Sequence, residues 1–160
     1  MRIALFEPDI PPNLGTILRL GACLETPVHV IEPCGFPFSV QAIRRSAMDY
    51  LEHAEICRHD SWEAFQREKP AGRLVLMTTK AAIPYTDFQF AADDIILLGR
   101  ESKGVPEHVH AAADARLLIP IKSGLRSINV ATAAAMVLGE GLRQLQAFPR
   151  REPHPSLSRP

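Results

Sequence analysis

The chain has few cysteines and no excess of charge of either sign. Cys23, Cys34 and Cys57 are its three cysteines, and no Cys-x-x-Cys pair occurs among its 160 residues. This scarcity argues against a disulfide framework and against a structural zinc site. The 18 basic and 18 acidic side chains cancel, so no global field draws the protein to nucleic acid or to an anionic membrane. Any contact with a polyanion must come from a local basic surface.

Long apolar runs are also missing. None approaches the roughly 18 residues that a membrane helix needs, and the apolar stretch near Met1 is too short for a signal peptide. The six histidines have no spacing typical of metal ligands, so we expect no metal. We therefore expect a soluble, unexported protein of the reducing cytoplasm.

Short, continuous apolar runs predict the fold class. We expect strands over residues 3–6, 28–31, 74–77, 95–98 and 116–121. Runs that do not alternate with polar residues are typical of parallel strands covered on both faces. The chain is long enough for one domain. The prediction is a single α/β domain over residues 1–148, with a mostly parallel sheet and helices on both faces, followed by a disordered tail over 149–160 that is rich in Pro, Arg and Ser.

Four helices are expected between and after these strands. The first has Asn13 as its N-cap, after Pro11-Pro12 blocks regular structure, and ends near residues 25–27. A second spans 39–50. The Asp60/Glu63 spacing is that of a capping box and predicts a third helix over 61–68, and a long alanine-rich helix spans 129–145. The expected inward-facing residues of the first and third helices are Leu14, Ile17, Leu18 and Ala22, and Trp62 and Phe65.

Three segments each look like a strand end that runs into a glycine-bearing loop and then into a helix: residues 13–19, 98–106 and 119–129. In an open α/β sheet the loops at the carboxyl ends of the strands converge on one crevice, where ligands usually bind. The second segment is neither a GxGxxG fingerprint nor a Walker loop, because its glycine spacing differs from both. The three segments together predict one ligand site.

Each segment also has an ordinary structural reading. Asn13 can simply cap a helix whose Arg19 is solvated, or Arg19 can bind a phosphate through its planar fork. Glu101 can be a solvated charge in a turn, or it can order neighbouring backbone amides or Arg19. Ser127 or Asn129 can be the cap of the last helix, where backbone N–H groups lack partners, or can contact a ligand there. For these two residues both roles can hold at once.

Taken together, the segments resemble the SPOUT superfamily of knotted RNA methyltransferases, and within it the TrmL-like group that methylates the wobble ribose of tRNA. The similarity extends from Arg2 to about Phe148 and includes the stretches 6–13, 31–36, 44–50 and 78–80. It implies a deep trefoil knot in the C-terminal part, an exception to the rule that chains do not thread. It also implies a homodimer built largely from the first and last helices, with S-adenosylmethionine bound in the knot and S-adenosylhomocysteine as the product.

The resemblance also assigns roles to individual positions. The cofactor would be held by Met77, Leu98, Gly99, Ile119, Ile121, Leu125 and Ser127. The catalytic set would be Arg19, Asn13, Glu101, Ser127 and Asn129, with Arg19 near the reacting hydroxyl. The best candidates for contacts with RNA phosphates are Arg44, Arg45, Lys103 and Arg126, together with Lys80 and Arg143. Each can also be a solvated charge, and a dimer could gather them into one basic stripe.

The implied reaction is in-line transfer of a methyl group to the 2'-hydroxyl of a wobble cytidine or uridine in tRNA. Alignment of the two reactants alone can supply several kcal/mol of such a reaction's barrier. Arginine is almost never deprotonated, so a phosphate bound by Arg19 is an easier proton acceptor than Arg19 itself. Two other functions stay open: 2'-O-methylation of ribosomal RNA or of another tRNA position, and a non-catalytic module that binds RNA or the cofactor.

Overall fold

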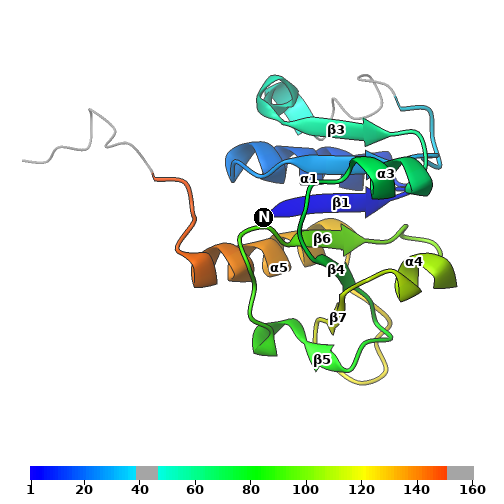
Figure 1. Cartoon of the computed structure of the whole chain (residues 1–160), viewed down its shortest axis with the longest axis vertical. Helices are drawn as coiled ribbons and strands as arrows, with labels where there is room; N and C mark the ends of the chain where they lie inside the picture. The colour runs from blue at the N-terminus through cyan, green and yellow to red at the C-terminus, as the bar shows by residue number, and fades with distance from the viewer. Residues whose placement is uncertain (39–46, 151–160) are drawn as a thin grey trace, which may run out of the picture.

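The computed structural model describes residues 1–38 and 47–150. A seven-stranded sheet forms its centre, with the strands in the order β3-β2-β1-β6-β4-β7-β5 (Figure 1). Every pair of neighbouring strands is parallel. The strands are β1 (Arg2–Phe6), β2 (Val28–Ile31), β3 (Ile56–His59), β4 (Leu74–Met77), β5 (Ile83–Pro84), β6 (Ile95–Leu98) and β7 (Ala115–Leu118). The predicted fold class, α/β with a parallel sheet, is confirmed.

Helices cover both faces of the sheet. They are α1 (Pro11–Cys23), α3 (Trp62–Glu68), α4 (Glu107–Ala111) and α5 (Val130–Leu145), and two 3-10 turns are η1 (Met48–His53) and η2 (Tyr85–Asp87). Alternate strand residues point to opposite faces. Ile3, Leu5 and Ile96 therefore pack with α1 and α5 on one face. Phe6, Leu76 and Leu97 pack with α3 and α4 on the other.

The first helix differs from its prediction at its start. It begins at Pro11, with Ile10 as the N-cap, so Asn13 lies inside the first turn and does not cap the helix. The reason is that the first helical positions need no N–H donor, which makes them favourable for proline rather than a barrier. Leu14, Ile17 and Leu18 are buried as expected, whereas Gly21 is buried in place of Ala22.

Two other boundaries were predicted wrongly. Ser61, not Asp60, caps α3, because its side chain accepts a hydrogen bond from the backbone N–H of Ala64. The last strand runs over Ala115–Leu118 and so ends before Pro120, which has no N–H for strand pairing. β3 and β5 were not expected, whereas α4 is the helix expected after the segment 98–106.

Two predicted segments fall wholly or mostly outside the described residues: the helix over 39–50, which carries Arg44 and Arg45, and the tail over 149–160. The last helix is confirmed over Val130–Leu145. In the part of the chain that is described, no helix combines the length and the apolar character needed to cross a bilayer.

Candidate functional site

Because the sheet is parallel, the segments that follow β1, β4, β6 and β7 all emerge at one edge. A pocket of about 590 Å³ lies there and is lined by residues of all three glycine-bearing segments. Its volume falls within the range of about 300–1,000 Å³ that is common for small-molecule sites. The three segments meet at one pocket, as the sequence predicts, and its role as a ligand site stays a prediction.

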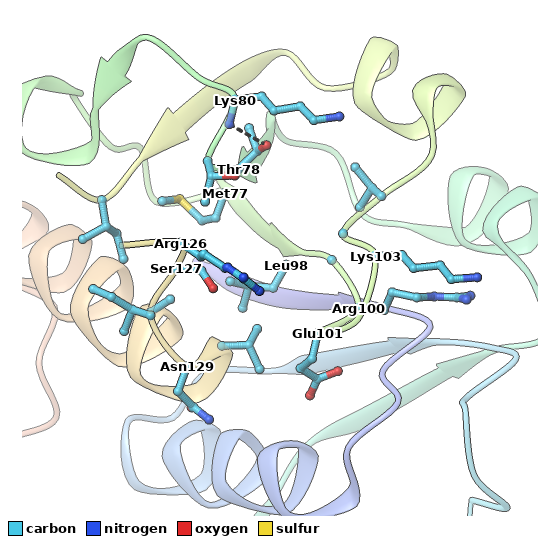
Figure 2. A pocket seen from close by; sticks show the side chains of 18 of the residues that line it. Met77, Thr78, Lys80, Leu98, Arg100, Glu101, Lys103, Arg126, Ser127 and Asn129 are labelled. Atoms are coloured by element: carbon cyan, nitrogen blue, oxygen red, sulfur yellow. Dashed lines mark hydrogen bonds between the residues drawn. The ribbon is translucent and has the colours of Figure 1, made fainter. Parts of the chain in front are cut away.

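The pocket has apolar walls and polar rims. Met77, Leu98, Gly99, Ile119, Ile121 and Ser127 line it, as do Asn13, Glu101, Lys103, Arg126 and Asn129. In Figure 2 Met77, Leu98 and Ser127 lie at the centre, Glu101 and Asn129 lie on the side next to α1, and Lys80 lies on the opposite side. The site therefore offers apolar surface, a carboxylate and several cations within one cavity.

Two expected site residues do not line this pocket. Leu125 is 66% exposed and follows Gly124, whose φ of +88° turns the chain. Arg19 lies six positions after Asn13 on α1, and its guanidinium stacks over the ring of Tyr50 in η1, 4.8 Å from the centroid. Six residues advance a helix by about 9 Å and turn it well away from the starting face, which explains why Asn13 reaches the pocket and Arg19 does not.

The loop after β6 is folded back on itself. Arg100 and Gly104 exchange backbone hydrogen bonds of 3.2 and 2.8 Å, and Gly104 has φ +68°, a conformation that glycine adopts without strain. A side chain at Gly99 would place its Cβ 2.7 Å from the carbonyl carbon of Gly104. Both glycines are therefore needed for the shape of this wall of the pocket.

A chain of amide hydrogen bonds joins the three segments. Asn13 Nδ2 donates to Glu101 Oε1 at 2.9 Å, and Asn129 Nδ2 donates to Asn13 Oδ1, also at 2.9 Å. Asn129 Oδ1 in turn accepts from the backbone N–H groups of Ala131 and Thr132, which caps α5. Asn129 is therefore both the helix cap and a member of the site, while Ser127 does not cap the helix.

Glu101 is more basic than an ordinary glutamate. Burial, together with the neighbouring carboxyl of Asp9, raises its pKa, and its hydrogen bond from Asn13 opposes this shift. The pKa of Asp9 is lowered, mainly by its side-chain hydrogen bond with Glu101. Of these two adjacent carboxyl groups, Glu101 is therefore the first to take up a proton.

Sequence reasoning did not assign His110 to the site. This residue lies on α4 and lines the pocket. Arg116 Nε donates to His110 Nδ1 at 3.1 Å, so the ring proton lies on Nε2. Nε2 is buried and has no hydrogen-bond partner among the described residues. Leaving a buried donor unpaired costs about 1–3 kcal/mol, which a ligand with an acceptor atom would relieve.

Among residues 1–38 and 47–150, no three His, Cys, Asp or Glu side chains are arranged to hold a metal ion. The residues present suit a different kind of ligand. The apolar walls suit a planar heterocycle, Glu101 suits a positive charge, and Lys80 suits a carboxylate. S-adenosylmethionine carries all three of these groups, so the pocket fits this cofactor.

The chain is similar in sequence and in fold to known proteins. The chain is 57% identical over 148 residues, 91% of its length and 92% of the relative's, to a tRNA (cytidine(34)-2'-O)-methyltransferase of Beijerinckia indica. It matches a solved structure concerned with the 2-OH methylation of C/U34 on tRNA, with a TM-score of 0.86, 35% identity and coverage of 91% and 95% of the two chains.

A second solved structure is an AdoMet-bound rRNA methyltransferase from Sinorhizobium meliloti. It matches with a TM-score of 0.80 and 26% identity over 90% of this chain and 56% of the other. The model of the SpoU rRNA Methylase family matches residues 1–139. The chain therefore belongs to the SpoU methylase family.

Proposed function

We propose that this protein is an S-adenosylmethionine-dependent methyltransferase that modifies the ribose 2'-hydroxyl of the wobble nucleotide, cytidine or uridine 34, in tRNA. The observation that carries the proposal is the pocket in which all three glycine-bearing segments meet, in a chain that is 57% identical over 91% of its length to a tRNA (cytidine(34)-2'-O)-methyltransferase.

The proposed cofactor site consists of Met77, Leu98, Gly99, Ile119, Ile121 and Ser127, all of which line the pocket. When bound, the cofactor supplies a methyl group on a positively charged sulfur and leaves as S-adenosylhomocysteine. The glycine loop lets backbone groups approach the ligand closely. Glu101 lies in the same pocket, where an ionised carboxylate favours the positive charge of the sulfonium.

We assign the RNA side of the reaction to cations around this cavity. Lys103 and Arg126 line it, and with Arg44 and Arg45, which lie outside the described residues, they are the proposed phosphate contacts. Arg19 would bind the phosphate beside the reacting ribose, and that phosphate would accept the hydroxyl proton, since a guanidinium is not deprotonated in proteins. Asn13, Glu101, Ser127 and Asn129 would orient the ribose.

The proposal includes a homodimer, because Arg19 does not line the pocket of its own chain. Its position on α1 suits action across an interface formed by α1 and α5, which pack side by side. A twofold dimer would then build two equal sites, each with a pocket from one copy and Arg19 from the other. We also propose the C-terminal trefoil knot, one methyltransferase domain over residues 1–148, and action in the cytoplasm, where tRNA is modified.

The test is methyl transfer from labelled S-adenosylmethionine to total tRNA and, in parallel, to ribosomal RNA from a strain that lacks this activity, followed by nucleoside mapping. Label in 2'-O-methylcytidine or 2'-O-methyluridine at position 34 supports the proposal. Label only in ribosomal RNA supports the other methyltransferase function. Absence of label in both RNAs despite tight cofactor binding supports a non-catalytic module.

A matched pair of variants tests the RNA contacts. Arg126→Ala removes a cation at the pocket, whereas Arg67→Ala removes an exposed cation on α3, away from the pocket. We expect Arg126→Ala to weaken tRNA binding and to reduce the salt slope of log K by about one, the value for one phosphate contact. Arg67→Ala should change neither quantity, and equal effects of the two variants would contradict the assignment.

A further inference from the structure

The segment between β1 and α1 holds a carboxylate, Asp9, that does not line the pocket but contacts the loop that does. Asp9 Oδ1 accepts a hydrogen bond from the backbone N–H of Glu101 at 3.2 Å, and Asp9 Oδ2 accepts one from the Ser102 hydroxyl. In return, the backbone N–H of Asp9 donates to Glu101 Oε2 at 3.1 Å. The side chain of each of these two residues thus accepts a hydrogen bond from the backbone N–H of the other.

This contact lies at the junction of three segments. Arg100 forms an ion pair with Glu7, two residues before Asp9. On the other side, the backbone N–H of Gly35 donates to Pro8 O at 2.9 Å. A Cβ added at Gly35 would lie 2.5 Å from the Cβ of Asp9. The segment of Asp9 is therefore held by the loop at Gly35, while the Asp9 side chain holds residues 101–102.

The consequence reaches the site through Glu101. With Oε2 bonded to the Asp9 backbone, Oε1 is left to accept from Asn13 Nδ2 at 2.9 Å. Without the Asp9 side chain, the backbone N–H of Glu101 and the hydroxyl of Ser102 lose their acceptors. The Glu101 side chain then keeps its bonds from Asn13 Nδ2 and from the backbone N–H of residue 9, but the backbone of residues 101–102 loses its bonds to the segment before α1. Glu101 and the adjoining pocket wall could then move.

We propose that Asp9 is a positioning residue for methyl transfer, which sets the place of Glu101 and of the pocket wall over residues 99–104 without touching either reactant. This inference rests on the proposed function. In this inference Asp9 holds the loop in its conformation, and Glu101 contacts the reactants.

The first test compares Asp9→Ala with Asp60→Ala, which removes an exposed aspartate at the end of β3. We expect Asp9→Ala to lower kcat about tenfold to a hundredfold, the cost of misplacing a reacting group by about 1 Å, with a smaller change in KM for tRNA. Asp60→Ala should keep the wild-type kcat. Equal kcat values for Asp9→Ala and Asp60→Ala would overturn the proposal.

The second test is a pH profile of kcat for Asp9→Asn. The amide keeps a carbonyl acceptor for the Glu101 N–H, so this variant should retain most of the activity. The negative neighbour of Glu101 is lost, whereas Lys103, Arg126 and the Arg100–Glu7 pair are unchanged. Because Asp9 raises the pKa of Glu101, the acid limb of the profile should move to lower pH. An unmoved limb together with low activity would indicate a purely structural role and would overturn the proposal.

The third test separates this inference from the proposed function. Hydrogen exchange of the Glu101 amide reports directly on its bond to Asp9 Oδ1. Exchange should be faster in Asp9→Ala than in Asp60→Ala, whether or not the protein methylates tRNA. Unchanged exchange would overturn the positioning role. If the wild-type protein is inactive but exchange is faster in Asp9→Ala, the proposed function is rejected. The contact by which Asp9 holds residues 101–102 is then still supported.

Discussion

Replacement of Asn129 should separate the stability of α5 from the working of the site. The Asn129 side chain caps α5 through Oδ1, at 2.9 and 3.3 Å from two backbone nitrogens, and holds Asn13 through Nδ2 at 2.9 Å. Loss of an N-cap costs about 1 kcal/mol, and loss of one more hydrogen bond costs about 0.5–1.5 kcal/mol. Asn129→Ala should therefore lower the free energy of unfolding by about 2 kcal/mol.

Asn129→Asp is the matched variant. Its carboxylate still caps the helix, and a negative charge near a helix N-terminus is favourable. It cannot donate to Asn13, however, because both of its oxygens are acceptors. We expect Asn129→Asp to keep the wild-type stability or exceed it, while its methyl transfer falls with that of Asn129→Ala.

Urea denaturation at fixed protein concentration, read beside initial rates of methyl transfer, provides the assay. For a chain of this size a loss of about 2 kcal/mol corresponds to a fall in Tm of about 4–8 °C. Destabilisation of Asn129→Asp as large as that of Asn129→Ala, or methyl transfer by Asn129→Asp at the wild-type rate, would refute these two roles of Asn129.

Three further predictions concern other parts of the molecule. Arg19→Ala and Gly99→Ala should each be inactive alone. If Arg19 acts across a twofold dimer, an equal mixture of the two should show about a quarter of the wild-type rate, because half of the dimers are mixed and each mixed dimer has one intact site. If Arg19 acts within its own chain, the mixture should stay inactive. Burial and the nearby His59 and Arg2 lower the pKa of His29 to about 4, so on acidification the unfolded chain binds the proton first. The free energy of unfolding, measured by urea titration, should therefore fall as the pH drops from about 6.5 towards 4. A pH-independent value over this range would contradict the burial of a neutral ring. Gly35→Ala should reduce methyl transfer and leave circular dichroism unchanged, because its Cβ would displace the segment before α1, and wild-type kinetics would show that this segment yields without consequence.

The sequence predicted the centre of the sheet better than its edges. β1, β4 and β6 are continuous apolar runs, since both of their faces are covered. β3 contains Arg58 and His59, and β5 is two residues long, so neither shows an apolar run. The polar composition of β3 follows from its place at the edge of the sheet, which only the tertiary structure determines.

For the site, the sequence indicated which loops would meet but not which side chains would face one another. Asn13 was predicted as a cap because an isolated asparagine before an apolar helix is typical of one. Its bonds instead go to Glu101 and Asn129, 88 and 116 positions away. Arg19 was placed at the site although the helical turn carries it to Tyr50. Asp9 and His110 gave no local signal, because their partners lie on other segments.

The strand order has a consequence for the way the chain becomes a folded protein. β1 pairs with β6, so Ile3 meets Ile96, and the helix that covers their face, α5, begins at residue 130. Contacts between residues so far apart in sequence form slowly. A nascent chain can align β1, β2 and β3 early, but β1 stays unpaired on one side until β6 has been made. The pocket is completed only when residues 119–133, which follow β7, have been synthesised, so no ligand can bind there before that segment exists.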